Sequence, residues 1–207
     1  GSMLRPALRE SDFDTEKKVI LEEIAMYEDN PFWVLYERSM EEYFGKHPLG
    51  HRVLGTPATI NAMTAGQMKD YFGRRYSADN TVVALAGRLD FDVCVKQIDR
   101  LCGWWERTAP GRDSTEPRTH KATLALKDAK VTRGYALMVS PGPSFGDERR
   151  YAASLLAQVL GGADNSRLHW ALVETGIADQ AEAGYDPRDG TGDFMMFVSC
   201  DPERMDE

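Results

Sequence analysis

Two glutamates, Glu16 and Glu23, are the residues whose spacing most directly suggests chemistry. They stand seven positions apart in a segment with helical periodicity, and two turns of an α-helix take about 7.2 residues. Both carboxylates are therefore expected on one helix face, about 10 Å apart along the axis. A carboxylate between apolar neighbours such as Ile20 and Tyr27 either becomes neutral or finds a cation. One interpretation is a metal-binding face. The other is a solvated surface, because two lysines directly follow Glu16.

A second pair, His47 and His51, has the four-residue spacing that can align two histidines on a helix. Pro48 and Gly50 lie within this pair, and both residue types disfavour a regular helix. We therefore do not expect zinc to bind here. The cysteines lack a C-x-x-C pair, which indicates small buried apolar side chains rather than a zinc knuckle or a disulfide framework. They are Cys94, Cys102 and Cys200.

Two other segments resemble ligand loops only superficially. Residues 186–193 are rich in Asp and Gly, but a calcium loop needs alternating oxygen ligands and a terminal Glu. Gly161 and Gly162 are not followed by the Lys-Ser/Thr of a phosphate loop. Neither segment is expected to bind its ligand.

The elements that must position these residues alternate between helical and strand patterns. Asn30 and Pro31 are a typical helix start, and Thr64 with Gln67 forms a capping box. The periodicity predicts helices over residues 14–28, 31–44, 58–62, 65–76, 91–105, 147–160 and 165–174. It predicts strands over residues 81–87 (fully buried), 122–126, 131–139, 179–185 and 194–200. This pattern is typical of an α+β protein.

Composition limits the classes of partner. The 207 residues carry a net charge of −8, with 42 % hydrophobic and 28 % charged residues. An acidic chain without a basic cluster is not expected to bind nucleic acid. No apolar run approaches the roughly 20 residues of a membrane helix. We therefore expect a soluble protein with a packed core, whose compartment the sequence leaves open.

The chain divides at a segment rich in Pro and Gly. Residues 1–13 are interpreted as a tag remnant and an N-terminal segment, 14–106 as the later part of a first domain, 107–120 as a linker, and 121–207 as the first part of a second domain. Both ends read as boundaries within a longer protein.

Several motifs in order resemble the pitrilysin/insulinase family of zinc metallopeptidases. Residues 16–31 (EKKVILEEIAMYEDNP) are similar to the family segment that carries the third zinc ligand. The later motifs are HPLGH (47–51), LG (54–55), YSADN (76–80) and VALAG (83–87). They resemble the bacterial processing-protease branch, which is related to the mitochondrial processing peptidase. The linker, the restart at Ala122 and the stretch 161–168 resemble the join to a second, homologous domain.

This resemblance implies a fold, an activity and a site. The fold would be two partial homologous domains with antiparallel-rich sheets covered by helices. The longer protein would be a zinc-dependent endopeptidase that hydrolyses peptides or unfolded protein segments with metal-activated water, and it could form a homo- or hetero-dimer. Glu23 matches the third ligand of Zn²⁺, and Glu16 matches an acidic residue that orients a ligand or tunes the bound water.

The sequence departs from the family pattern in two places. No His-x-x-Glu-His motif or its inverse occurs, so this chain alone is expected to be inactive and to hold no tightly bound zinc. Active members often carry an Arg and a Tyr that grip the substrate backbone. The matching positions here fall near Leu172 or Val173 and at Asp179.

Two alternatives remain open. A non-catalytic scaffold or partner subunit of the same family would explain the missing Arg and Tyr. A stand-alone α+β protein-binding module would make the resemblance misleading, and it predicts a complete fold with no open sheet edge. A piece of a longer domain instead predicts open edges and dimerisation by strand pairing.

Overall fold

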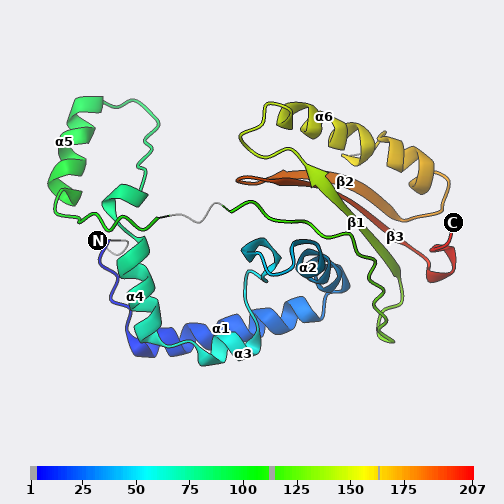
Figure 1. The fold of residues 1–207 in the computed structure, drawn as a ribbon, viewed down its shortest axis with the longest axis horizontal. Helices are drawn as coiled ribbons and strands as arrows, with labels where there is room; N and C mark the ends of the chain where they lie inside the picture. Colours follow the sequence, from blue (N-terminus) through cyan, green and yellow to red (C-terminus); the bar gives the residue numbers. More distant parts are fainter. Residues whose placement is uncertain (1–3, 112–114, 163) are drawn as a thin grey trace. The chain divides into compact units, whose positions relative to one another are not determined.

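The computed structural model describes residues 4–111, 115–162 and 164–207 of an α+β chain (Figure 1). Its α-helices are α1 (Glu10–Glu28), α2 (Pro31–Phe44), α3 (Pro57–Ala62), α4 (Ala65–Arg75), α5 (Phe91–Cys102) and α6 (Arg150–Gly161). Its short helical turns are η1 (Pro48–Gly50), η2 (Ala78–Asn80), η3 (His169–Val173, π-helical) and η4 (Pro202–Arg204). Its strands are β1 (Gly134–Gly142), β2 (Gln180–Pro187) and β3 (Gly192–Cys200). The predicted α+β class is confirmed.

The chain forms two compact units that each combine distant segments. Unit 1 comprises Gly1–Leu21 and Pro57–Asp113, and unit 2 comprises Glu22–Thr56 and Ser114–Glu207. One of the three points at which the chain passes between the units thus falls inside the predicted linker, whereas residues 22–56 group with the later half. The division into two homologous partial domains stays a prediction.

Helix ends in both units follow the caps that the sequence predicts. In unit 2, Oδ1 of Asn30 accepts hydrogen bonds from the backbone N–H groups of Phe32 and Trp33 at 3.0 and 3.4 Å. The helix ends at Gly45, whose φ of 56° suits glycine. In unit 1, Thr64 and Gln67 make the reciprocal bonds of a capping box. These caps are local, so the sequence alone locates them.

Unit 2 is built on a three-stranded antiparallel sheet with the order β1-β3-β2. Strand β3 is central and pairs with both neighbours. Helix α6 lies on one face and α2 on the other (Figure 1). Helix α6 buries Ala153, Ala157 and Gly161 at four-residue intervals, and these small residues allow a close approach to β2. The antiparallel sheet covered by helices is therefore as expected, and β1 and β2 are its edges.

The core of unit 2 forms where α2 meets the sheet. Its buried members are Met40, Tyr43 and Phe44, against which Val139 of β1 and Met195 of β3 pack. The ring of Phe32 meets that of Phe197 edge-on, with centroids 4.9 Å apart. Along β3, the side chains of residues 195 and 197 point to one face of the sheet and those of 196 and 198 to the other. The strand therefore has residues facing both the α2 layer and the α6 layer.

Two predicted strands are wrong, and one predicted helix is shorter than expected. Residues 81–87 and 122–126 form no strand and are exposed, with Val82 at 91 %. An apolar run becomes a strand only when a neighbouring strand pairs with it, and none pairs with either segment among the described residues. The predicted helix over 165–174 is present but shorter, over residues 167–173, and most of it is the π-helical η3.

Candidate metal centre

Both predicted site residues lie on α1, where the predicted helix is confirmed and begins four residues earlier than expected. Glu16 and Glu23 are exposed. The continuous helix puts them two turns apart, and the residue after Glu23, Ile24, is only 4 % exposed. Among the described residues, neither carboxylate has a hydrogen-bond or ion-pair partner. Their side chains are thus free to meet a cation.

A mostly apolar recess of about 310 Å³ lies beside Glu16 in unit 1. It is lined by Leu8, Phe13, Ile20, Ile60, Met63, Ala65 and Met68, together with Arg9, Asp12, Glu16 and Lys17. The Nζ of Lys17 donates hydrogen bonds to the carbonyl oxygens of Asn61 and Met63, both at 2.9 Å. Lys17 therefore ties α1 to the end of α3 and does not neutralise Glu16.

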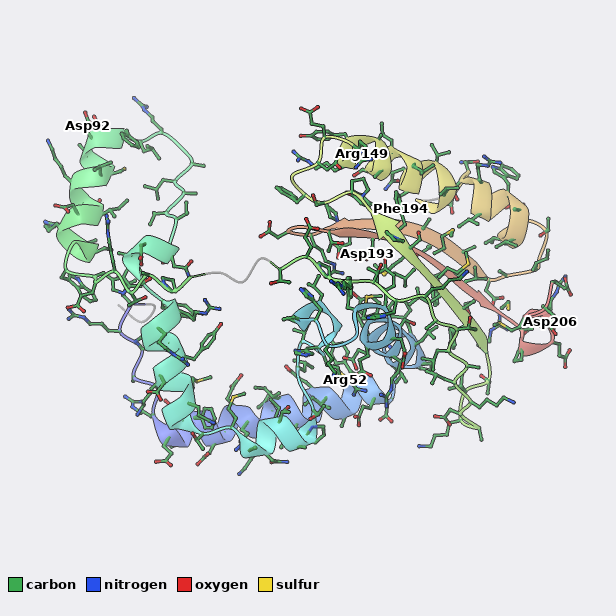
Figure 2. The ribbon with its side chains drawn as sticks, in the orientation of Figure 1. Arg52, Asp92, Arg149, Asp193, Phe194 and Asp206 are labelled. Carbon is green, nitrogen blue, oxygen red and sulfur yellow. The ribbon has the colours of Figure 1, made fainter. Side chains whose placement is uncertain are left out.

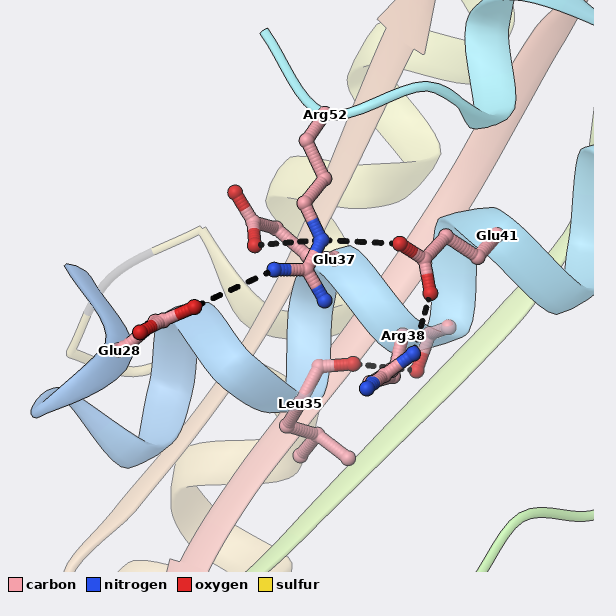
Figure 3. A network of polar contacts seen from close by, with 7 residues as sticks. Glu28, Leu35, Glu37, Arg38, Glu41 and Arg52 are labelled. Atoms are coloured by element: carbon pink, nitrogen blue, oxygen red, sulfur yellow. Dashed lines mark hydrogen bonds and ion pairs between the residues drawn. The ribbon is translucent and has the colours of Figure 1, made fainter. Parts of the chain in front are cut away.

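Three other acidic residues of unit 2 form ion pairs with one arginine, Arg52. Figure 3 shows the Arg52 guanidinium between Glu37 and Glu41, with Glu28 at the end of α1 on a third side. The Nε of Arg52 lies 2.9 Å from Glu41 and 3.4 Å from Glu37, and Nη1 lies 3.8 Å from Glu28. This three-carboxylate cluster is an ion-pair network, so it is not available to a metal.

The pKa values of the two central carboxylates of this cluster are shifted in opposite directions. Burial raises the pKa of Glu37 more than Arg52 lowers it. Burial also acts to raise the pKa of Glu41, but hydrogen bonds from Arg52 and Arg38 outweigh it and lower that pKa. No sequence pattern indicates this cluster, because its members come together only through the fold of residues 28–52.

A second ion pair, between half-buried Arg188 and buried Asp193, occupies the Asp- and Gly-rich segment in which calcium is not expected to bind. Asp193 has no exposed surface and lies within unit 2 (Figure 2). The Nε of Arg188 donates to its Oδ1 at 3.0 Å, and Nη2 lies 2.8 Å from Asp186. Burial raises the pKa of Asp193 despite the hydrogen bond from Arg188. The arginine fills the position that a cation would need.

The first residue of the histidine pair, His47, has a local structural role. His47 caps η1: Nδ1 accepts from the backbone N–H of Leu49 at 3.2 Å, and Nε2 lies 3.0 Å from the carbonyl oxygen of Thr115, to which it donates. Both ring nitrogens of His47 are thus engaged. Within the described ranges, no group of three or more His, Cys, Asp or Glu side chains could hold a metal ion. These residues by themselves do not fit a zinc site.

The positions that match the family's substrate-gripping pair serve the fold. The carbonyl oxygen of Leu172 accepts from the backbone N–H of Ala178 at 2.9 Å. The side chain of Asp179 pairs with Arg133, and its backbone N–H donates to Ser199 at 2.8 Å. Along the part of the chain described, no helix is long and apolar enough to cross a membrane.

Comparison with curated proteins finds relatives that are named as zinc proteases. The chain is 35 % identical to an uncharacterized zinc protease of Mycobacterium leprae over 93 % of its own length and 44 % of the relative. It is 34 % identical to one of Mycobacterium tuberculosis, over 93 % of this chain and 45 % of the relative. The chain thus spans about half the length of the curated relatives that it matches.

Solved structures share the fold. A peptidase M16 inactive domain from Pseudomonas fluorescens matches with a TM-score of 0.87 and 22 % identity, over 97 % of this chain and 49 % of that one. A protease from Helicobacter pylori matches with a TM-score of 0.85 and 19 % identity, over 94 % of this chain and 49 % of that one.

A family model supports the same assignment from sequence. Residues 62–207 match the model described as the peptidase M16 inactive domain, which is the pitrilysin/insulinase group that the motifs resemble. The match covers well over half of the chain. We conclude that this chain belongs to the M16 peptidase family.

Proposed function

We propose that this chain is one part of a zinc-dependent endopeptidase that acts on peptides or unfolded protein segments, and that Glu23 is its contribution to the metal site. The curated relatives are named as uncharacterized zinc proteases, which supports the reaction class. Glu16, two turns away on the same helix, would act on the site through a ligand or the bound water rather than as a ligand itself.

The observation that carries this proposal is that two glutamates of α1 are exposed and have no partner among the described residues. Arg52 engages Glu28 at the end of this helix, whereas Glu16 and Glu23 have no described partner. The exposed carboxylate of Glu23 lies next to buried Ile24, on a helix that packing holds in place. A fixed metal ligand requires such a rigid support.

The remaining ligands and the general base must come from outside these residues. A single carboxylate does not hold zinc, since catalytic sites use three protein ligands and one open position. The apolar recess beside Glu16 offers a binding surface for a helix that carries them. Such a helix would cover Phe13, Ile20 and Met63 within unit 1.

A non-catalytic role within the same family is the second candidate. It is favoured by Leu172 and Asp179, which stand near the expected Arg and Tyr positions and make structural hydrogen bonds instead. The stand-alone module is less well supported, because the described sheet leaves β1 and β2 as edges.

Zinc content of the full-length protein tests the proposal. We expect about one zinc per chain by mass spectrometry, and a loss of metal affinity of roughly 10- to 100-fold or more in Glu23→Gln. Glu22→Gln, the adjacent exposed glutamate about 100° around the helix, is the matched control and should keep its zinc. Equal metal content in Glu23→Gln and the control would exclude Glu23 as a ligand. A zinc-free wild-type protein without peptidase activity would favour the non-catalytic role.

A further inference from the structure

Helix α6 is apolar on the side that faces away from the sheet. Its sheet-facing residues, Ala153, Ala157 and Gly161, are buried. Tyr151, Leu155 and Val159 are 63 %, 68 % and 57 % exposed. The two sets are offset by two residues, or about 200° around the helix. The exposed three therefore form one ridge, here called the α6 ridge, opposite the buried side.

The start of the α6 ridge is held in a defined conformation. The Arg150 guanidinium lies over the rings of Phe145 and Tyr151, 4.9 and 4.5 Å from their centroids. Its Nη2 also donates to the hydroxyl of Tyr151 at 2.7 Å, and Phe145 is 61 % exposed. Two aromatic side chains are thus fixed in place at the protein surface, at little further cost in side-chain entropy on binding.

The charge of α6 also differs from that of the rest of the protein. Arg150 is its only charged residue, in a chain with a net charge of −8. A solvated helix normally carries charged residues on its outer side. An outer side with large apolar residues and no acidic residue is instead typical of a surface that another element covers.

We infer that the α6 ridge is a docking surface for an amphipathic helix supplied by a further part of the protein, which would correspond to the length of the relatives that this chain does not match. Helix α6 satisfies its own backbone hydrogen bonds, so it offers no edge to a strand. Side chains four residues apart form the ridge that fits the groove of a second helix. The relatives carry more than half of their length outside the matched part, which provides the source. This inference rests on the proposed function only in that the chain is one part of a longer protein, and it does not depend on the zinc site.

Thiol labelling tests the inference. Leu155→Cys is made in this chain and in the full-length protein, and modification of the introduced thiol by a maleimide is followed by mass spectrometry. We expect rapid labelling in this chain and labelling about tenfold slower, or more, in the full-length protein, where only local opening exposes the site. Ser154→Cys, exposed on the neighbouring side of α6, is the control and should label at similar rates in both.

The two alternative occupants of the α6 ridge, a second copy of this chain and an outside partner, would give different labelling results. Protection of the introduced thiol in this chain, together with a dimer mass by light scattering, would overturn the inference in favour of a second copy. Equal, rapid labelling in both proteins would overturn it in favour of an outside partner. Leu155→Gln gives a second readout that does not depend on the thiol. It should leave the thermal midpoint of this chain unchanged and lower that of the full-length protein by several degrees.

Discussion

The guanidinium of Arg188 and the carboxylate of Asp193 form a hydrogen-bonded ion pair, with Nε and Oδ1 3.0 Å apart, at the hairpin that joins β2 to β3. Asp193 is fully buried. Its Oδ2 has no hydrogen-bond partner among the described residues. Across the strands its register partner is Asp186, which Arg188 also contacts. One arginine thus compensates two facing carboxylates, and the hairpin depends on it.

Asp193→Ala is expected to destabilise unit 2 by about 3 kcal/mol, the lower end of the usual cost of removing one partner of a buried pair. The lower end applies because Asp186 remains beside Arg188. Asp186→Ala, at a half-exposed carboxylate, should cost only about 0–1 kcal/mol. Urea unfolding followed by far-UV circular dichroism measures both. Similar losses in the two variants would contradict the proposed importance of the buried partner.

The pH dependence should differ in sign between two aspartates. Burial raises the pKa of Asp193, so the pH-dependent part of its contribution to the free energy of unfolding is favourable and complete below its ordinary pKa, and it is lost as the pH rises through the raised value. Hydrogen bonds from Arg149 lower the pKa of Asp147 to about 2. The contribution of Asp147 is therefore present above its ordinary pKa and is lost as the pH falls toward 2.

Thermal midpoints between about pH 2.5 and 6, a range that brackets the ordinary aspartate pKa of about 4, test the signs. The midpoint of the wild type minus that of Asp147→Asn should shrink as the pH falls. The same difference for Asp193→Asn should grow. Parallel pH profiles for the two variants would show that one of the assigned directions is wrong.

Arg52→Gln should destabilise unit 2 by about 1–3 kcal/mol at pH 7, because it leaves partly buried carboxylates without their charged hydrogen-bond partner. Glu37 and Glu41 would then repel each other, so the loss should decrease as the pH falls and they become protonated. Arg38→Gln, at a side chain that is 51 % exposed, is the control and should cost less than about 1 kcal/mol. Denaturant unfolding at pH 7 and pH 4.5 gives the comparison. A loss that is independent of pH would argue against the carboxylate cluster.

Gly161→Ala should be costly because a Cβ there would lie 2.3 Å from the backbone nitrogen of Ala183. Helix α6 would have to move away from β2, at about 1–3 kcal/mol. Gly73→Ala is the contrast: nothing lies within 4 Å of its Cβ position in α4, so it should stabilise that helix by about 0.5–1 kcal/mol. Thermal unfolding of the two variants checks both signs. A neutral Gly161→Ala would mean that α6 does not approach the sheet so closely.

Local chemistry explains which parts of the fold the sequence predicts well. Asn30 and Thr64 satisfy backbone N–H groups two or three residues away, so their helices can be located without tertiary information. The run over residues 81–87 has the composition of a buried strand. Its conformation, however, depends on a pairing partner far away in sequence, and no local pattern reveals whether one is present.

The candidate site shows the same limit. The spacing of Glu16 and Glu23 is enough to place both on α1, but their role depends on groups beyond the described residues and stays a prediction. The sequence does not point to Arg52 and Arg188, because a lone arginine in a loop gives no sign of the carboxylates that it will meet. Arg52 contacts the carboxylates of residues 28–41 only after α2 has formed. Arg188 contacts Asp186 and Asp193 only after the β2–β3 hairpin has formed.

The central position of β3 has a consequence for how this protein is made. Strand β1 leaves the ribosome well before β3, yet its hydrogen-bond ladder within the described sheet runs entirely to β3. The β1 segment therefore lacks its β3 partner while α6, η3 and β2 are synthesised. During that interval its free N–H and C=O groups are open to wrong partners. A nascent chain halted before residue 192 would be a natural client for chaperones.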